Sequence, residues 1–214
     1  MWFLPQRLAE QTGPLVLALV TAACGAPRAT VVSAPKRAGA PAIDAGAEEA
    51  CTPSGPETCF DAIDNNCNGI IDEGCGLPTG TLQFVIAWGL PVDVDLEVTD
   101  PEGGRTPPDA RGKASKMLKD RDCPGRDNAC RGQNTEVVYF PGDQPPAGTY
   151  RVAIRIGDRP GPGATFPIPV RWGVRIGART YGATVLLASE RDEKVLEVLV
   201  DPDALPRARP EPTR

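Results

Sequence analysis

The segment from Asp61 to Cys75 reads DAIDNNCNGIIDEGC, and it crowds carboxylate and carboxamide oxygens around two cysteines. Like charges at this spacing repel one another, so the folded protein must offset them. Side-chain oxygens at alternate positions, followed by a glycine, are the ligand pattern that a hard cation such as Ca²⁺ requires. The sequence therefore predicts a calcium site in this segment.

A calcium loop of EF-hand type can be laid on the segment with Asp64 at its first position. Gly69 then takes the turn position, as such a loop requires. Cys75 stands at the twelfth position, where a Glu normally closes the shell, so Glu73, Asp61 or a water is expected to close it. No flanking helix pair is evident, so this would be a calcium loop without the EF-hand fold. The predicted metal ligands are Asp61, Asp64, Asn66, Asn68, the carbonyl of Ile70, Asp72 and Glu73.

Four cysteines recur at intervals of eight residues around this loop: Cys51, Cys59, Cys67 and Cys75. About 25 residues cannot hold a hydrophobic core, so cross-links and a metal are expected to stabilise a microdomain over residues 51–76. A metal-free alternative stays open, in which the Asp and Asn side chains only make turns within a disulfide knot.

Cysteine number indicates an oxidising compartment. The chain has seven cysteines, and if Cys24 carries a lipid, the remaining six form an even set. Six cysteines permit 15 pairings, so the connectivity of the first four is open. Cys123 and Cys130 stand apart from the others and are predicted to bond each other, with free buried thiols as the alternative.

The pattern C-x7-C-x-D-x-x-D-N-N-C-N-G-x-I-D-E-G-C over residues 51–75 resembles the MopE-like metal-binding motif of secreted and surface proteins of myxobacteria. That resemblance implies a metal site and associates it with copper. Soft-metal ligands are poorly supplied here, however, because the chain has no histidine and the cysteines are expected to be oxidised.

A second acidic group follows in the run VDVDLEV. Asp93, Asp95 and Glu97 lie two residues apart, so all three point to one face of the expected strand. Solvent, a basic residue on a neighbouring strand, or a shared cation could relieve their repulsion. The residues predicted for a second metal site are Asp93, Asp95, Asp120, Asp122 and Glu136.

Composition excludes several functions. The absence of histidine rules out Ser-His-Asp catalysis, and a net charge of −5 without a basic cluster argues against nucleic acid as a partner. A glycan-active hydrolase that uses two carboxylates is the one enzymatic alternative. Aromatic residues make up only 5% of the chain and no nucleophile motif is present, so a non-enzymatic module is expected.

These acidic groups must be positioned by β-strands. Short β-rich runs separated by Gly and Pro fill residues 80–201, and several alternate with period two, as Val152, Ile154 and Ile156 do. The pattern predicts a mainly β fold, an antiparallel β-sandwich of jelly-roll or immunoglobulin-like kind. The polar stretch Pro101–Gln133 is expected to be a surface excursion.

The runs WGLPVDVDLEVTDPEG and GTYRVAIRI are similar to those of a YfaP-like bacterial β-sandwich family. The resemblance implies the sandwich fold and an accessory role on envelope proteins, and says little about activity. The residues that carry it are Trp88, Asp93, Asp95, Leu96, Pro101, Gly103, Gly148 and Tyr150.

The N-terminus indicates export. Residues 1–23 read as a signal peptide with a ten-residue apolar run, and Cys24 after Ala22 and Ala23 resembles the lipidation site of bacterial lipoproteins. We therefore expect an outer-membrane lipoprotein of the cell envelope, periplasmic or surface-exposed, held by its lipid and offering the sandwich to a protein or glycan partner. A soluble secreted protein is the alternative. Residues 24–50 and 202–214 are expected to be a disordered tether and a disordered tail.

Overall fold

The computed structural model describes residues 51, 53–108, 110, 112–123, 133–157 and 164–201, and the backbone of residues 48–49. All of them belong to one compact unit, Arg37–Arg214. The predicted signal peptide, Cys24, most of the predicted tether, Cys130 and the predicted tail lie outside the described residues.

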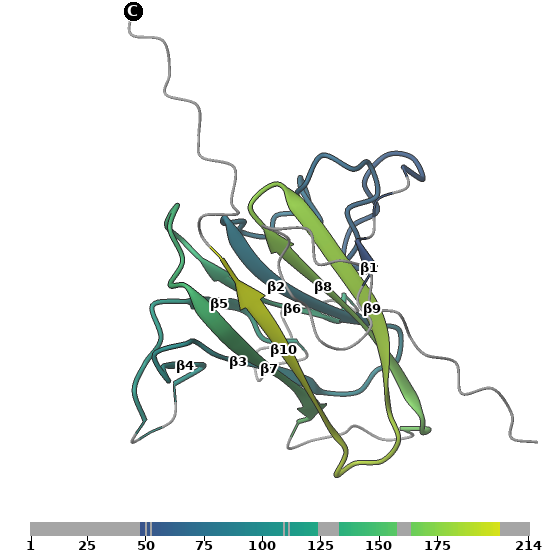
Figure 1. Cartoon of the computed structure of the whole chain (residues 1–214). Helices are drawn as coiled ribbons and strands as arrows, with labels where there is room; N and C mark the ends of the chain where they lie inside the picture. The colour runs from purple at the N-terminus through teal and green to yellow at the C-terminus, as the bar shows by residue number, and fades with distance from the viewer. Residues whose placement is uncertain are drawn as a thin grey trace, which may run out of the picture. The chain divides into compact units, whose positions relative to one another are not determined.

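Two antiparallel sheets build the described part of the chain, which contains ten strands and no helix (Figure 1). One sheet has the strand order β1-β9-β8-β2-β6-β5, and the other has the order β10-β7-β3-β4. The predicted antiparallel β-sandwich is therefore confirmed. The strands are β1 (Glu48–Glu49), β2 (Leu82–Trp88), β3 (Val94–Thr99), β4 (Arg105–Thr106), β5 (Leu118–Arg121), β6 (Thr135–Phe140), β7 (Gly148–Ile156), β8 (Ile168–Ile176), β9 (Arg179–Leu187) and β10 (Glu193–Val200).

The main core lies between the two sheets, where alternate residues of each strand point inward. Leu96 on β3, Ile154 on β7 and Trp172 on β8 are almost completely buried there. Phe84 and Tyr150 face each other across the core with their ring centroids 5.9 Å apart. Because these positions alternate with polar ones along β3 and β7, the period-two pattern in the sequence locates the core correctly.

β2 departs from that alternation, because all seven of its residues are buried. One face of β2 contributes to the main core, while Val85 and Ala87 belong to a second apolar cluster. Ala62 and Ile71, from the disulfide-rich segment, pack in this second cluster together with Val137 of β6. Residues 51–76, which we call the knot, thus form a third layer on the outer face of the six-stranded sheet.

The knot approaches β8 as closely as it does because Gly173 has no side chain. A Cβ atom at residue 173 would lie 2.5 Å from the carbonyl oxygen of Ala62 and 3.0 Å from the Cδ1 atom of Ile71. The knot therefore obtains from the sandwich the apolar contacts that its own length cannot provide.

The polar stretch Pro101–Gln133 takes a larger part in the fold than a surface excursion would. It contributes β4 to one sheet and β5 to the other. Met117 is buried in the main core, and its carbonyl oxygen accepts a hydrogen bond of 3.1 Å from the Thr106 hydroxyl. β5 is short and polar, and its pairing with β6 shifts register between Lys119 and Arg121, which explains why alternation in the sequence does not reveal it.

Candidate metal centre

Two interleaved disulfides frame the knot. Cys51 bonds Cys67 and Cys59 bonds Cys75, and each bridge spans 16 residues. The structure therefore confirms these four cysteines as disulfide-bonded and supplies the connectivity that the sequence leaves open. Cys123 is also disulfide-bonded, and its predicted partner lies outside the described residues.

Asp64 is the anchor of the predicted cation loop. The backbone N–H of Asn68 donates to its Oδ1 atom at 3.1 Å, and that of Gly69 donates to its Oδ2 atom at 2.8 Å. The hydroxyl of Thr180, on β9, also donates to Oδ2 at 3.2 Å. Asp64 is only 3% exposed, so its carboxylate ties the loop to the sheet from a buried position.

Three further side chains of the loop converge on one point. The carboxamide Nδ2 atoms of Asn66 and Asn68 both donate to the Oε1 atom of Glu73, the latter at 2.5 Å. The other carboxylate oxygen of Glu73, Oε2, is buried and has no hydrogen-bond partner within the described part of the chain. A buried carboxylate oxygen without a donor is costly unless a cation or water satisfies it. The Oδ1 atoms of Asn66 and Asn68 accept the N–H groups of Asn68 and Ile70, so the orphaned Glu73 oxygen is the atom here that fits a hard cation such as Ca²⁺.

Asp72 holds the backbone that precedes the loop. Its carboxylate accepts hydrogen bonds from the backbone N–H groups of Phe60, Asp61 and Ala62, at 2.8, 3.2 and 3.3 Å. Phe60 and Ala62 have positive φ angles of 67° and 59°, so these bonds hold a backbone conformation that side chains disfavour. Burial raises the pKa of Asp72 to about 6, although the backbone donors partly oppose that shift.

Asp61 and the N–H group of Ile70 make further local hydrogen bonds. Asp61 Oδ1 accepts the Ile63 N–H at 2.9 Å, and its Oδ2 accepts the Asn65 carboxamide at 3.3 Å. The N–H of Ile70 donates to Asn68 Oδ1 at 2.9 Å. Of the predicted ligands, the structure therefore brings together Asn66, Asn68 and Glu73 beside the anchoring Asp64.

Glu57 is a residue of this site that the sequence pattern does not identify. Its two carboxylate oxygens accept the N–H groups of Asp72 at 2.9 Å and Asn65 at 3.0 Å. Burial raises the pKa of Glu57, and the charges of Glu73 and Asp64 raise it further, against the effect of the two backbone donors. Because Glu57 lies outside the loop register, its position between two cysteines is the only signal in the sequence.

The second predicted site is assembled in part. Carboxylate oxygens of Asp95, Asp122 and Glu136 lie within 4.8 Å of one another. Asp120 is exposed on β5, and Asp93 lies beside Gly157, whose N–H donates to the Asp93 carbonyl at 2.9 Å. Three of the five predicted residues therefore meet, from β3, β6 and the residue following β5.

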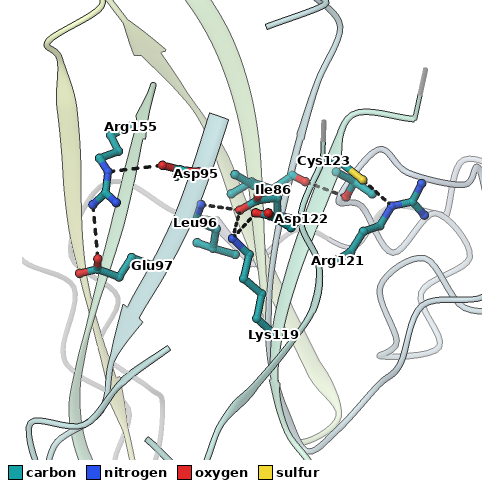
Figure 2. Close-up of polar contacts among 11 residues, drawn as sticks. Ile86, Asp95, Leu96, Glu97, Lys119, Arg121, Asp122, Cys123 and Arg155 are labelled. Carbon is teal, nitrogen blue, oxygen red and sulfur yellow. Dashed lines mark hydrogen bonds and ion pairs between the residues drawn. The ribbon is translucent and has the colours of Figure 1, made fainter. Parts of the chain in front are cut away.

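Lys119 supplies a positive charge to this second cluster. Its ammonium lies 2.9 Å from Asp122 Oδ1 and 3.0 Å from Glu136 Oε2, and Figure 2 shows it directed at Asp122. Both acids raise the pKa of Lys119, although burial opposes them. The Lys119 ammonium thus offsets the negative charge of acids for which the sequence predicts a second metal ion.

Arginines relieve the remaining charges on β3. Arg155 lies between Asp95 and Glu97, at 3.6 and 3.3 Å, as Figure 2 shows. Arg105 also pairs with Glu97. The acidic face of β3 is thus neutralised by basic residues on β7 and β4, which was one of the alternatives considered for it.

Glu136 connects the two sheets. It is completely buried on β6, and its Oε2 atom accepts the backbone N–H of Leu96, on β3 of the opposite sheet, at 2.6 Å. Burial raises the pKa of Glu136 well above its ordinary value, and Lys119 only partly opposes that shift. β3 pairs with β4 only at Val98 and Thr99, so the Glu136 carboxyl caps a part of the β3 edge that β4 does not cover.

A cavity of about 220 Å³ opens next to this cluster and is lined by Pro107 and residues 119–122. This volume is below the range of about 300–1,000 Å³ that is typical of small-molecule sites. Glu136 is not among the lining residues. Of the three acids of the cluster, Asp122 lines the cavity, together with Asp120.

Comparison with known proteins yields no relative: no family model, no curated protein and no solved structure matches this chain. The MopE-like and YfaP-like resemblances therefore rest on the motifs quoted above. Among the described residues there is also no helix with the length and apolar character needed to cross a membrane. Function is accordingly inferred from the two carboxylate sites.

Proposed function

We propose that this chain is a non-enzymatic module of the cell envelope whose knot binds Ca²⁺ and thereby fixes its loops on the β-sandwich. The cation would bind to oxygens of Asn66, Asn68 and Glu73, with Asp64 organising the loop. The Glu73 Oε2 atom carries this proposal, because it is a buried carboxylate oxygen without a donor.

The donor chemistry favours calcium over copper. The side chains of the loop carry carboxylate and carboxamide oxygens, and the four cysteines of the knot are oxidised. Copper sites in proteins need imidazole, thiolate or thioether ligands, whereas calcium takes carboxylate and amide oxygens. The cation stabilises the knot by offsetting the repulsion among Asp64, Glu73 and Glu57.

A binding role is favoured over hydrolysis. In the second cluster, Lys119 and Arg155 pair with the acids, and Glu136 is buried. These paired and buried acids are better suited to connecting β3, β5 and β6 than to acting as the catalytic acid and base of a glycan hydrolase. We extend the proposal to an outer-membrane lipoprotein anchored at Cys24, with the sandwich presented to a protein or glycan partner. The disulfides support an extracytoplasmic location.

Thermal melting of the oxidised protein tests the calcium site. A ligand that binds only the folded form adds RT ln(1 + [L]/Kd) to its stability. Without the bidentate Glu of a full EF-hand loop, we expect a Kd of about 10⁻⁴ to 10⁻³ M, so about 1 mM Ca²⁺ should add about 0.4–1.4 kcal/mol relative to a chelator.

A matched pair of variants separates the site from general charge effects. Glu73→Gln should abolish the calcium-dependent shift, whereas Glu190→Gln, at an exposed turn residue, should preserve it. An identical melting temperature of the wild-type protein with calcium and with chelator would show that the knot is stabilised by its disulfides and turns alone.

A further inference from the structure

We propose that Asn68 is a site of spontaneous covalent modification, deamidation, and that the closed cation loop protects it. Asn68 is exposed and is followed directly by Gly69. In an Asn–Gly peptide, the absence of a side chain on the second residue leaves the backbone nitrogen free to reach the preceding carboxamide. This inference rests partly on the proposed calcium site, and its experiment distinguishes the two.

The reaction needs only water. The backbone nitrogen of Gly69 attacks Cγ of Asn68, its proton passes to the departing amide nitrogen, and ammonia leaves as a five-membered succinimide forms. Water then opens this ring at either carbonyl. The products are an aspartyl residue, or an isoaspartyl residue in which the main chain runs through the former side chain. The net change replaces an amide NH₂ by OH, and no oxidant or reductant is consumed.

The structure holds both reacting groups away from this reaction. The Gly69 N–H donates to the buried Asp64 Oδ2 at 2.8 Å, so the nucleophile is engaged. The Asn68 carboxamide is held at both ends, by the N–H of Ile70 at 2.9 Å and by Glu73 Oε1 at 2.5 Å. Attack therefore requires the loop to release these bonds.

Electrostatics makes that release depend on the cation. Three carboxylates lie in the knot: Glu57 accepts the N–H groups of Asn65 and Asp72, Asp64 accepts those of Asn68 and Gly69, and Glu73 faces Asn66 and Asn68, so their like charges oppose one another. A cation bound at Asn66, Asn68 and Glu73 offsets this repulsion and restrains the Asn68 side chain directly. Loss of the cation should loosen the loop and expose the Gly69 nitrogen.

The two products would affect the site differently. An aspartyl residue at position 68 adds a carboxylate to the loop and should strengthen cation binding through charge. An isoaspartyl residue adds one main-chain atom before Gly69, whose backbone lies so close to the Ala178 carbonyl that an ideal Cβ would be 2.6 Å from its oxygen. That product cannot keep the closed loop.

The experiment incubates the oxidised full-length protein at neutral pH with calcium or with a chelator. Peptide mass mapping locates the mass change of deamidation, and enzymatic methylation of isoaspartate quantifies that product. We expect deamidation at Asn68 to be slowest with calcium, faster with chelator, and fastest in the reduced protein unfolded in urea. Asn134, which precedes Thr135, serves as the internal reference and should change little.

A pair of carboxylate variants, both incubated with chelator, tests the protection independently of calcium. Asp64→Ala removes the acceptor of the Gly69 N–H and should accelerate deamidation at Asn68 several-fold. Glu190→Gln changes an exposed acid outside the knot, and should leave the rate near that of the wild-type protein. Melting curves establish that both variants fold.

The outcomes separate the two proposals. Calcium binding with equal deamidation rates in calcium and chelator would overturn the cation-dependent protection and leave the calcium site standing. If calcium does not bind, slow deamidation of the oxidised protein relative to the urea-unfolded chain, together with acceleration by Asp64→Ala, would still support protection by the loop. Equal rates in the folded and unfolded protein would overturn the proposal, whether or not Asp64→Ala folds.

Discussion

Gly69 is constrained twice in the loop between Cys67 and Cys75. Its φ angle is +85°, which side chains rarely adopt, and an ideal Cβ would lie 2.6 Å from the carbonyl oxygen of Ala178. Its N–H also completes the hydrogen bonding of Asp64. At the scale of single residues, this position therefore couples the conformation of the loop to the turn between β8 and β9.

Replacement of Gly69 by Ala should destabilise the protein and weaken calcium binding together. Gly76→Ala is the matched control, because Gly76 has a φ of +79° but nothing within 4 Å of the new Cβ. We expect Gly69→Ala to cost about 1–3 kcal/mol more than Gly76→Ala in urea unfolding, because only the former adds a backbone clash. Equal costs would mean that the turn moves freely to accommodate the methyl group.

The acidic residues show how far composition predicts a site. The spacing of Asp64, Asn66 and Asn68 locates the loop, because these residues lie close together in the chain. The spacing cannot distinguish Asp72, which hydrogen-bonds the backbone at residues 60–62, from Glu73, which faces the two Asn side chains. That distinction depends on the positive φ angles before the loop and on burial against the sheet, which are tertiary properties.

At the scale of elements, Glu136 and Lys119 hold β3, β5 and β6 together. Glu136 accepts the Leu96 N–H from the opposite sheet and pairs with Lys119 of β5. The Glu136 pKa is raised by burial, so the folded protein binds a proton that the unfolded chain releases near its ordinary pKa of 4.5. The stability from this group is fully present below pH 4.5 and is lost as pH rises through the folded-state pKa.

The variant Glu136→Gln should therefore flatten the pH dependence of stability. As pH rises above about 4.5, the free energy of unfolding of the wild-type protein should fall relative to that of the variant, because the neutral amide cannot ionise. Urea unfolding at constant saturating calcium measures both proteins across this range. Glu190→Gln, in an exposed turn, should follow the wild-type curve; parallel curves for all three would indicate that Glu136 remains charged throughout.

The strands of the sandwich are predictable to different degrees. β7 and β3 alternate because one face of each is buried, so the sequence locates them well. β5 reads LKDR, in which only one residue is apolar, so alternation of apolar and polar residues does not reveal it. It positions Lys119, and its register with β6 shifts between Lys119 and Arg121. The burial of both faces of β2 is likewise unforeseen, since it depends on a knot encoded earlier in the chain.

At the scale of the whole molecule, the knot is continuous with the sandwich through the cluster of Ala62, Ile71, Val85, Ala87 and Val137. Two polar contacts add to this connection. The Thr180 hydroxyl donates to Asp64, and the Cζ atom of Arg121 lies 4.7 Å from the centroid of the Phe60 ring. The knot and the sandwich should consequently unfold in one cooperative transition.

A chain shortened to begin at residue 80 tests this dependence. It exposes the outer face of β2 and β6, including Val85 and Val137, which the knot covers in the full chain. We expect increased binding of a hydrophobic dye, self-association in size-exclusion chromatography and a loss of several kcal/mol of stability, at about 1.5–3 kcal/mol per large apolar side chain. A monomeric fragment as stable as the full chain would show that the third layer is dispensable.

The pairing of β1 with β9 affects how the protein responds to mechanical tension. β1 joins the sheet through only two residues, Glu48 and Glu49, opposite Gly182 and Tyr181. A pull from the N-terminal side would peel these two residues away at low force. The load would then reach Cys51, whose covalent bond to Cys67 passes it directly into the knot and bypasses the 16-residue span between them. Under stretching, residues 48–49 should yield first, and the load should then enter the chain at Cys67, where the Cys59–Cys75 bridge limits the extension of the following loop.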